Sequence, residues 1–234
     1  MERVTLIHGT APIILVAPHA SEESFMAELV QEMAKKSKAY AIINNGFKKC
    51  DVVDVVDVIH DMADCNRVDH IHEDVVKDEF LDPLLYIKRN LCRRHPRVNV
   101  FYLRGFDPSF ETTLGSRIDL ILGYGQAVVN SSYICPLWMV DMFINEWEGH
   151  GWTSTSACCG KPGGKFSARS INHLPQLFQK HYPDDDVAAM EICTSWRFRQ
   201  DKGTAAFCGT ILSNIVDELA EADFFDETID KVYI

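Results

Sequence analysis

Residues 13–23 read Ile13-Ile14-Leu15-Val16-Ala17-Pro18-His19-Ala20-Ser21-Glu22-Glu23, a short apolar run that gives way at once to polar residues. The run Ile13–Ala17 is continuously apolar and rich in β-branched residues, which is typical of a strand buried on both faces. The same character is found in four other segments, at residues 40–43, 98–103, 118–122 and 187–193. Strands of this kind indicate a mostly parallel sheet, because such sheets are covered on both faces.

Longer amphipathic segments lie between these strands. Apolar residues recur at helical spacing over residues 25–33, 76–91 and 207–219, and Gly203-Thr204 could begin the last of these helices. The alternation predicts an α/β fold, a three-layer α/β/α sandwich with a mostly parallel central sheet. Ligands of such folds usually bind outside the carboxyl ends of the strands, so functional residues are expected just after each strand.

The chain has 234 residues, of which 47% are hydrophobic and 24% are charged. This is the composition of a globular protein, and no linker or internal repeat divides it, so one domain spanning residues 1–234 is expected. Its 34 acidic side chains outnumber its 23 basic ones and give a net charge of −11. That balance argues against a broad basic surface for nucleic acid and favours a metal ion or a small molecule as ligand.

The sequence also predicts a cytoplasmic protein without a membrane partner. No apolar run approaches the roughly 20 residues of a membrane-spanning helix, and the N-terminus lacks the pattern of a signal peptide. The eight cysteines are scattered and form no C-x-x-C pair, so free thiols are expected rather than disulfides or a structural zinc site. No cysteine stands beside a histidine at a strand-to-helix turn, which argues against a cysteine nucleophile.

His19 stands directly after the first predicted strand, where a site is expected. Its H-x-x-E spacing to Glu22 could point an imidazole nitrogen and a carboxylate at one metal ion, supplying two of the three protein ligands of a catalytic zinc. In the alternative interpretation, Ser21 caps the following helix, Glu22 and Glu23 complement its dipole, and His19 is only a polar turn residue.

A second cluster, Asp64-Cys65-Asn66-Arg67, combines an arginine with a carboxylate and an amide. Arg67 could bind a substrate carboxylate through two hydrogen bonds, with Asn66 as a further donor and Asp64 holding the arginine in place. A surface salt-bridge network is the alternative.

Glu191 interrupts the last predicted strand. An ionised glutamate is costly to bury without a partner, so this side chain is expected to face a cavity, a cation or a donor. A buried glutamate beside an activated water is suited to act as general base and acid in amide hydrolysis. The alternative is a structural ion pair with Arg197 or Arg199.

The glycine-rich segment 160–169 lacks the order of residues of a phosphate-binding loop. It could still present Lys165 and Arg169 to an anionic ligand, although a plain surface loop explains it equally well.

Five segments occur in an order that matches a known family: Val16-Ala17-Pro18-His19, Ala63-Asp64-Cys65-Asn66-Arg67, Ile118-Asp119-Leu120-Ile121-Leu122-Gly123, Lys161-Pro162-Gly163-Gly164-Lys165-Phe166 and Ala189-Met190-Glu191-Ile192. Together they resemble the N-formylglutamate amidohydrolase family and its distant relatives, the zinc carboxypeptidases and poly-γ-glutamate hydrolases.

The resemblance implies a phosphorylase/hydrolase-like three-layer fold, in which zinc is bound by a histidine and a glutamate of the first motif and by a second histidine from a central strand. His19 and Glu22 match the first two ligands. Asn66 and Arg67 are similar to the pair that anchors the substrate carboxylate. Arg169 resembles a further anion contact, and Glu191 matches the catalytic glutamate.

The chain departs from this pattern at the third ligand. The corresponding strand ends with Leu103-Arg104-Gly105, and an arginine cannot ligate zinc because it stays protonated and has no lone pair. His150 could complete the site, or the match could be displaced along the chain. Alternatively, the protein is a metal-free relative in which Arg104, close to Glu22 and Glu191, replaces the charge of the cation and helps to bind an anion.

The sequence therefore predicts a metal-dependent hydrolase, with zinc as cofactor, that cleaves an amide bond in a small carboxylate-bearing substrate such as an N-acyl amino acid or a γ-glutamyl compound. The alternative is a metal-free protein that binds an anionic ligand or acts in regulation. An apolar stripe in residues 133–147, including Trp138, Met139, Phe143 and Trp147, raises self-association as a third hypothesis, although most such stripes are core.

Overall fold

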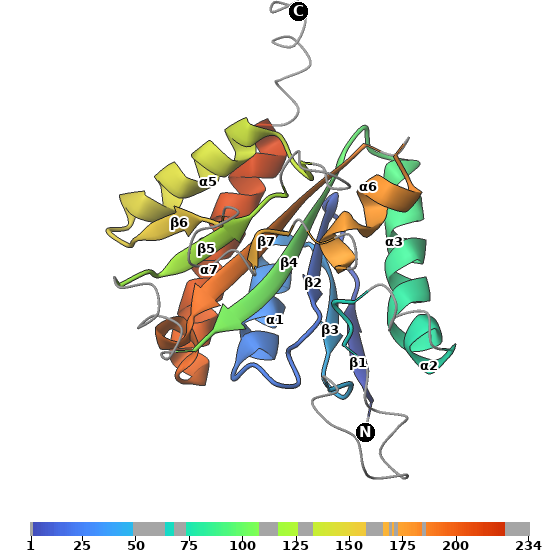
Figure 1. Ribbon diagram of the computed structural model, residues 1–234, viewed down its shortest axis with the longest axis horizontal. Coiled ribbons are helices and arrows are strands. Elements are labelled where there is room, and N and C mark those ends of the chain that lie inside the picture. Colours follow the sequence, from blue (N-terminus) through green and yellow to red (C-terminus); the bar gives the residue numbers. More distant parts are fainter. Residues whose placement is uncertain are drawn as a thin grey trace, which may run out of the picture.

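The structure, a computed structural model, describes residues 2–48, 64–67, 74–107, 117–125, 133–157, 166–168, 170, 173–183 and 186–222. Within these ranges, strands form one mixed sheet in the order β1-β3-β2-β4-β7-β5-β6 (Figure 1). In chain order the strands are β1 (Val4–Ile7), β2 (Ile13–Ala17), β3 (Tyr40–Asn44), β4 (Val98–Phe106), β5 (Leu120–Gly123), β6 (Ser154–Ser156) and β7 (Val187–Ser195).

The centre of the sheet is parallel. Strand β2 pairs in parallel with β3 and β4, and β4 pairs in parallel with β7 over its whole length. Strand β1 is antiparallel to β3, and β5 is antiparallel to β7. The carboxyl ends of the central strands β2, β4 and β7 therefore lie at one edge of the sheet, as expected for a ligand site in this class of fold.

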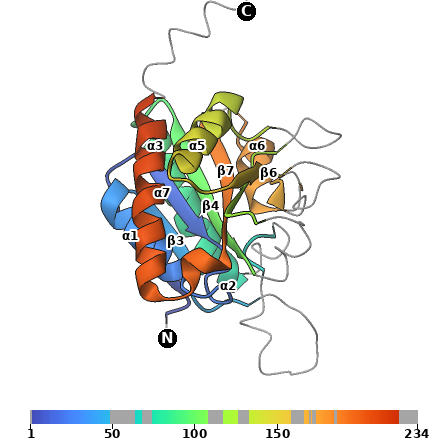
Figure 2. The ribbon, with the colours of Figure 1, turned by 90° about the vertical axis from the view of Figure 1, so that its left-hand side faces the viewer.

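Helices cover both faces of the sheet, which confirms the predicted three-layer α/β/α sandwich. One face packs against α1 (Met26–Ser37), α5 (Leu137–Gly149) and α7 (Lys202–Ala222), and the other packs against α3 (Asp82–Cys92) and α6 (Leu177–His181). Figure 2 shows α1 and α7 on one side of the sheet and α6 on the other. Strand β4 contributes side chains to the core on both faces of the sheet. Val100 and Tyr102 belong to one apolar cluster, and Phe101 and Leu103 belong to the other. This alternation follows from the two-residue period of a strand.

The helix expected over residues 76–91 is interrupted. A short helix, α2 (Asp74–Val76), leads into a turn of π-helix at Lys77–Leu81 before α3 begins. Pro83 in the first turn of α3 has no backbone N–H to donate, which is consistent with a break in the regular hydrogen-bond ladder at this point. Helix α7 begins where Gly203-Thr204 predicted, because Asp201 Oδ1 accepts hydrogen bonds from the backbone N–H groups of Gly203 and Thr204 at 2.8 and 2.9 Å.

The apolar stripe expected within residues 133–147 forms α5. Met139, Phe143 and Trp147 are buried in the core, and Trp138 packs against it. These four side chains are thus largely used in packing within the chain. None of the helices in the described ranges combines the length and apolarity required to cross a lipid bilayer.

Candidate functional site

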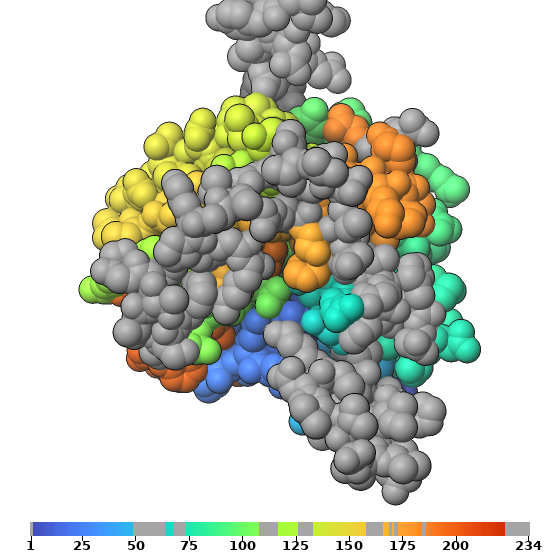
Figure 3. Space-filling view, viewed as in Figure 1, coloured from blue at the N-terminus to red at the C-terminus, as the bar shows by residue number. Residues whose placement is uncertain are grey.

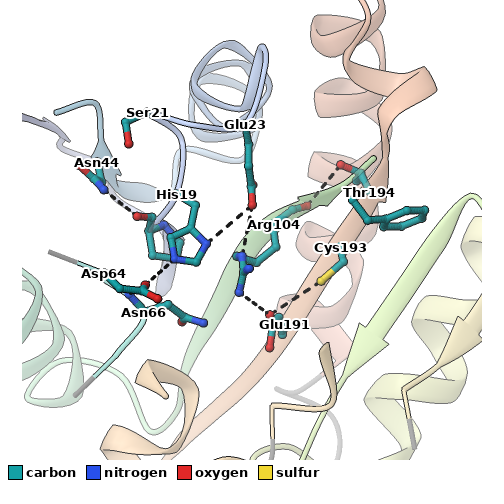
Figure 4. A network of polar contacts seen from close by, with 12 residues as sticks. His19, Ser21, Glu23, Asn44, Asp64, Asn66, Arg104, Glu191, Cys193 and Thr194 are labelled. Atoms are coloured by element: carbon teal, nitrogen blue, oxygen red, sulfur yellow. Dashed lines mark hydrogen bonds and ion pairs between the residues drawn. The ribbon is translucent and has the colours of Figure 1, made fainter. Parts of the chain in front are cut away.

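His19 follows the carboxyl end of β2 and is almost completely buried. Its Nε2 lies 2.5 Å from Asp64 Oδ1, and its Nδ1 lies 3.7 Å from Glu23 Oε1 (Figure 4). The backbone carbonyl of His19 accepts the N–H groups of Glu22 and Glu23 at 2.9 and 3.0 Å. This tight turn carries Glu23 back towards the imidazole ring.

Asn44, at the end of β3, fixes the entry to this turn. Its Nδ2 donates to the carbonyl oxygens of Pro18 and Phe47 at 2.7 and 2.8 Å, and its Oδ1 accepts the N–H of Phe47 at 2.8 Å. Because Asn44 is only 1% exposed, these bonds satisfy polar groups that would otherwise be buried without partners.

The segment 64–67 lies across the same edge of the sheet. Asp64 Oδ1 also accepts the backbone N–H of Asn66 at 2.9 Å, and Asn66 O accepts the N–H of Leu174 at 2.8 Å. Arg67 forms an isolated β-bridge with His173. These bonds bring residues 64–67 and 173–174 together and hold the Asp64 carboxylate against His19.

Arg104 projects from the carboxyl end of β4 and joins two carboxylates. Its Nε lies 3.3 Å from Glu23 Oε1, and its Nη1 lies 3.2 Å from Glu191 Oε1 (Figure 4). Burial alone would lower the pKa of the Arg104 guanidinium, but the charges of Glu23 and Glu191 raise it above its ordinary value. Arg104 therefore carries a positive charge at the centre of the site.

Glu191 comes from the middle of β7, opposite Tyr102 of β4, and is 1% exposed. Burial raises the pKa of the Glu191 carboxyl, and the charge of Arg104 offsets only part of this effect. Its second oxygen, Oε2, has no hydrogen-bond partner among the described residues. Cys193 Sγ lies 3.8 Å from Glu191 Oε1.

The pKa values of three more ionisable groups are shifted by this arrangement. Burial would raise the pKa of Glu23, but its close contact with the His19 ring and the charge of Arg104 outweigh this effect, so the pKa is lowered. Burial and then the charge of Arg104 lower the pKa of His173, which favours a neutral imidazole. Burial also raises the pKa of the Cys193 thiol well above its ordinary value, so this cysteine is unsuited to act as a nucleophile.

A cavity of about 900 Å³ opens at this edge of the sheet. Figure 3 shows the corresponding face, where the blue, teal and orange segments of the chain meet. The cavity is lined by residues of the β2 turn, the 64–67 segment, the end of β4 and the turn after β7, and by two residues from between β6 and β7: His19, Glu22, Glu23, Ser24, Asp64, Asn66, Arg104, Gly105, Phe106, Asp107, Phe166, His173, Trp196 and Arg199. This volume lies within the range of small-molecule sites.

The structure thus brings most of the predicted site residues to one place. His19, Glu22, Asn66 and Arg104 line the cavity, and Glu191 lies behind Arg104 rather than in the lining. Arg67 is not part of the cavity lining, although its backbone pairs with that of His173, which is. Arg169 and Lys165 lie outside the described residues.

Other residues occupy positions that the sequence alone did not indicate. The carboxylate beside the His19 ring is Glu23, whereas Glu22 is exposed at the cavity wall. Arg197 pairs with Asp119 at 2.7 Å, so the partner of Glu191 is neither of the two arginines that follow it in sequence.

His150 is remote from the other candidate ligands. It ends α5, and its ring stacks on Trp152 with 5.4 Å between the centroids. It is not part of the cavity lining. The role of Asp64 in holding His19, and the presence of His173, Trp196 and Arg199 in the lining, had no distinct sequence signal.

Zinc binding at His19 would depend on the lone-pair donors that surround this residue. A catalytic zinc takes three protein ligands that carry lone pairs. His19 Nδ1, which has no hydrogen-bond partner among the described residues, and Glu23 could supply two. The central strand supplies Arg104 instead of a third, and no group of three His, Cys, Asp or Glu side chains in the described ranges could hold a metal ion. The described donors therefore do not fit zinc.

The fold and the cavity place this chain among α/β proteins whose site lies at the carboxyl edge of a parallel sheet. No protein-family model matches the sequence, and no curated protein matches it significantly.

Solved structures share the fold. N-formylglutamate amidohydrolase from Ralstonia eutropha is 12% identical with a TM-score of 0.58, over 95% of this chain and 98% of the other. A gene product of Agrobacterium tumefaciens is 12% identical with a TM-score of 0.62, over 96% of each chain. A bacteriophage poly-γ-glutamate hydrolase is 10% identical with a TM-score of 0.52, over 95% of this chain and 88% of the other. The resemblance expected from the sequence motifs is thus confirmed at the level of the fold.

Proposed function

We propose that this protein hydrolyses an amide bond in a small carboxylate-bearing substrate, such as an N-acyl amino acid or a γ-glutamyl compound. One observation carries the proposal. His19 is held through Nε2 by Asp64, and its Nδ1 has no hydrogen-bond partner among the described residues, in a ring that lines a cavity beside a fixed guanidinium. Two proteins of the same fold act, by their names, on N-formylglutamate and on poly-γ-glutamate, which supports this substrate class.

In this proposal His19 is the proton acceptor. When the Asp64 carboxylate accepts the Nε2–H, the Nδ1 atom keeps its lone pair and can take a proton from a water molecule. The same orienting role is played by the aspartate in Ser-His-Asp enzymes. The hydroxide attacks the carbonyl carbon, and the proton then passes from Nδ1 to the nitrogen of the leaving amine.

Arg104 stabilises the negative charge that develops on the carbonyl oxygen. A preorganised cation in a buried site can do this without reorganisation, and the two carboxylates that hold Arg104 keep its guanidinium in place. Glu191 then serves to position Arg104. Its predicted role as the proton-transfer group is a competing hypothesis, because its raised pKa also suits a general acid.

Asn66 and Arg67 remain the proposed contacts to the substrate, together with Arg169. Asn66 lines the cavity, and its buried Oδ1 has no partner in the described ranges, which leaves this atom as the proposed acceptor for a substrate N–H group. No zinc chemistry is assigned, because the donors within the described ranges do not fit the ion. A cytoplasmic location and self-association stay predictions from the sequence.

Hydrolysis of N-formyl-L-glutamate, N-acetyl-L-glutamate and γ-L-glutamyl amides, measured by released amine in excess EDTA, tests this proposal. Turnover by the wild type that persists in EDTA, and is lost in His19→Gln, is the expected result. Turnover that requires added zinc would overturn the metal-free assignment. The Glu191→Gln variant separates the two proton acceptors: a reduction of about tenfold fits a positioning role, whereas complete loss would identify Glu191 as the proton-transfer group.

The Arg104–Glu191 pair also favours a second candidate, a protein that binds an anionic ligand without turnover. In this hypothesis the guanidinium replaces the charge of a cation and the cavity is kept for binding. Binding of glutarate with no release of amine from any substrate of the panel would support this candidate over the enzyme.

A further inference from the structure

Arg199 differs from Arg104 and Arg197, two arginines that are only partly buried. It ends the short helical turn Trp196–Arg199, is 3% exposed and lines the cavity. Arg104 is neutralised by Glu23 and Glu191, and Arg197 by Asp119. In the ranges that the structure describes, no ion pair includes Arg199.

The hydrogen bonds of Arg199 go to backbone carbonyls. Its Nη1 donates to Ser24 O at 3.1 Å, and its Nη2 donates to Phe106 O at 3.2 Å and to Thr194 O at 3.5 Å. Its Nε is buried and has no partner among the described residues. The guanidinium therefore joins three chain segments but retains an unused donor and a full positive charge.

A buried charge of this kind calls for a negative partner. Carbonyl oxygens satisfy hydrogen-bond donors, but they do not cancel a net charge, and burial of an uncompensated ion is costly. Burial lowers the pKa of the Arg199 guanidinium, and the charge of Glu23 opposes this only in part. The guanidinium of Arg199 packs directly against Gly105, since a Cβ atom at this residue would lie 2.1 Å from Arg199 Nη2.

Acidic side chains also line the cavity, and their charges must be considered. Glu23 is held by Arg104, and Asp64 is held by His19. Glu22 and Asp107 are exposed, so solvent screens their charges. The inner wall at Arg199 is thus the part of the lining where a positive charge is least compensated.

We propose that Arg199 binds a carboxylate of the ligand, with the apolar part of the ligand against Trp196. This inference deepens the proposed function by naming a residue that selects acidic substrates, and it relies on that function only for the identity of the substrate. The planar guanidinium presents several donors in fixed directions, which suits a carboxylate better than a neutral amide.

Calorimetric titration with glutarate and with its neutral diamide, glutaramide, tests the proposal. We expect the wild type to bind glutarate at least tenfold more tightly than glutaramide. The variant Arg199→Met should weaken glutarate binding by about 10- to 100-fold and leave glutaramide binding unchanged. Arg93→Met, at an exposed arginine that ends α3 away from the cavity, removes the same charge and serves as the matched control.

Arg199→Met could fail to fold, because Arg199 joins three segments. The ¹⁵Nε–H nuclear magnetic resonance signal of Arg199 in the wild type, assigned by its absence in Arg199→Lys, provides a second readout. A shift of this signal on addition of glutarate, but not of glutaramide, supports the proposal. Equal affinity for both compounds overturns it. So does a signal that stays unchanged when glutarate is added at about 50 times the glutaramide concentration, on the order of millimolar.

The outcome is separable from that of the proposed function. If N-formyl-L-glutamate is cleaved and Arg199→Met leaves KM unchanged, the inference fails while the hydrolase proposal stands. If no amide is cleaved but glutarate binding depends on Arg199, the hydrolase proposal fails and the inference stands.

Discussion

Arg104 Nη1 lies 3.2 Å from Glu191 Oε1, so the central strand β4 places a permanent cation directly beside the buried carboxylate of β7. The same guanidinium contacts Glu23 through Nε at 3.3 Å. One side chain thus links the turn after β2 to the middle of β7 and supplies a positive charge at the position where the family resemblance implies a metal ligand.

Removal of Arg104 should destabilise the protein strongly. Arg104→Met leaves Glu23 and Glu191 without their cation, and breaking a buried pair by removing one partner typically costs about 3–5 kcal/mol. Urea unfolding followed by circular dichroism measures the loss. Addition of Glu23→Gln and Glu191→Gln to Arg104→Met should recover most of it. A loss below about 1 kcal/mol in the single variant would place the pair in the class of weak surface ion pairs.

Replacement of Arg104 by a metal ligand should create a zinc site. Arg104→His adds a third lone-pair donor to those of His19 and Glu23, so we expect about one zinc ion per chain by elemental analysis and a higher melting temperature in the presence of zinc. The double variant with His19→Ala is the control and should bind no zinc. Equal zinc contents in the wild type and Arg104→His would show that these donors do not converge.

Glu23 and Glu191 should respond to pH in opposite directions. The pKa of Glu23 is below its ordinary value of 4.5, so its ionised form stabilises the fold above that pH, and this contribution is lost as pH falls through the folded-state pKa. The pKa of Glu191 is above 4.5, so its ionisation costs stability as pH rises through the folded-state pKa.

At pH 7, Glu23→Gln should therefore lower the free energy of unfolding, and Glu191→Gln should raise it or leave it unchanged. Urea unfolding of both variants between pH 4 and pH 8 provides the measurement. A loss of stability in Glu191→Gln that grows with pH would contradict the assignment for that residue.

The buried thiol of Cys193 should be dispensable. Its pKa is raised by burial and by the charge of Glu191, so little thiolate forms at neutral pH. We expect Cys193→Ala to keep turnover within about twofold of the wild type, since loss of one buried sulfur affects packing more than chemistry. A drop of a hundredfold with unchanged stability would identify this cysteine as part of the chemistry.

The central layer of the fold was predictable because its strands are continuously apolar. Residues 13–17 and 187–193 read as buried strands, and β2 and β7 occupy them. The edge strands β1 and β6 were missed, because Ser154–Ser156 is polar and Val4–Ile7 is half exposed, and an edge strand needs no apolar run.

The site was predictable only in part, for a similar reason. His19 and Glu191 stand in or after buried strands, where a polar residue is conspicuous. The contact between Asp64 and His19 joins residues 45 positions apart and depends on how segment 64–67 crosses the sheet edge. Spacing within the sequence favoured Glu22 over Glu23, but the turn at His19 directs Glu23 to the ring, and only three-dimensional geometry distinguishes the two.

The role of the His19–Asp64 pair is best tested by the turnover of N-formyl-L-glutamate and γ-L-glutamyl amides, with the wild type and Asp64→Asn compared in the same assay. Asparagine keeps the shape of the side chain but removes the carboxylate that fixes the His19 tautomer, so we expect a fall in kcat of about 10³- to 10⁴-fold with little change in KM. Equal turnover by the two proteins would contradict the claim that the His19–Asp64 pair carries the reaction.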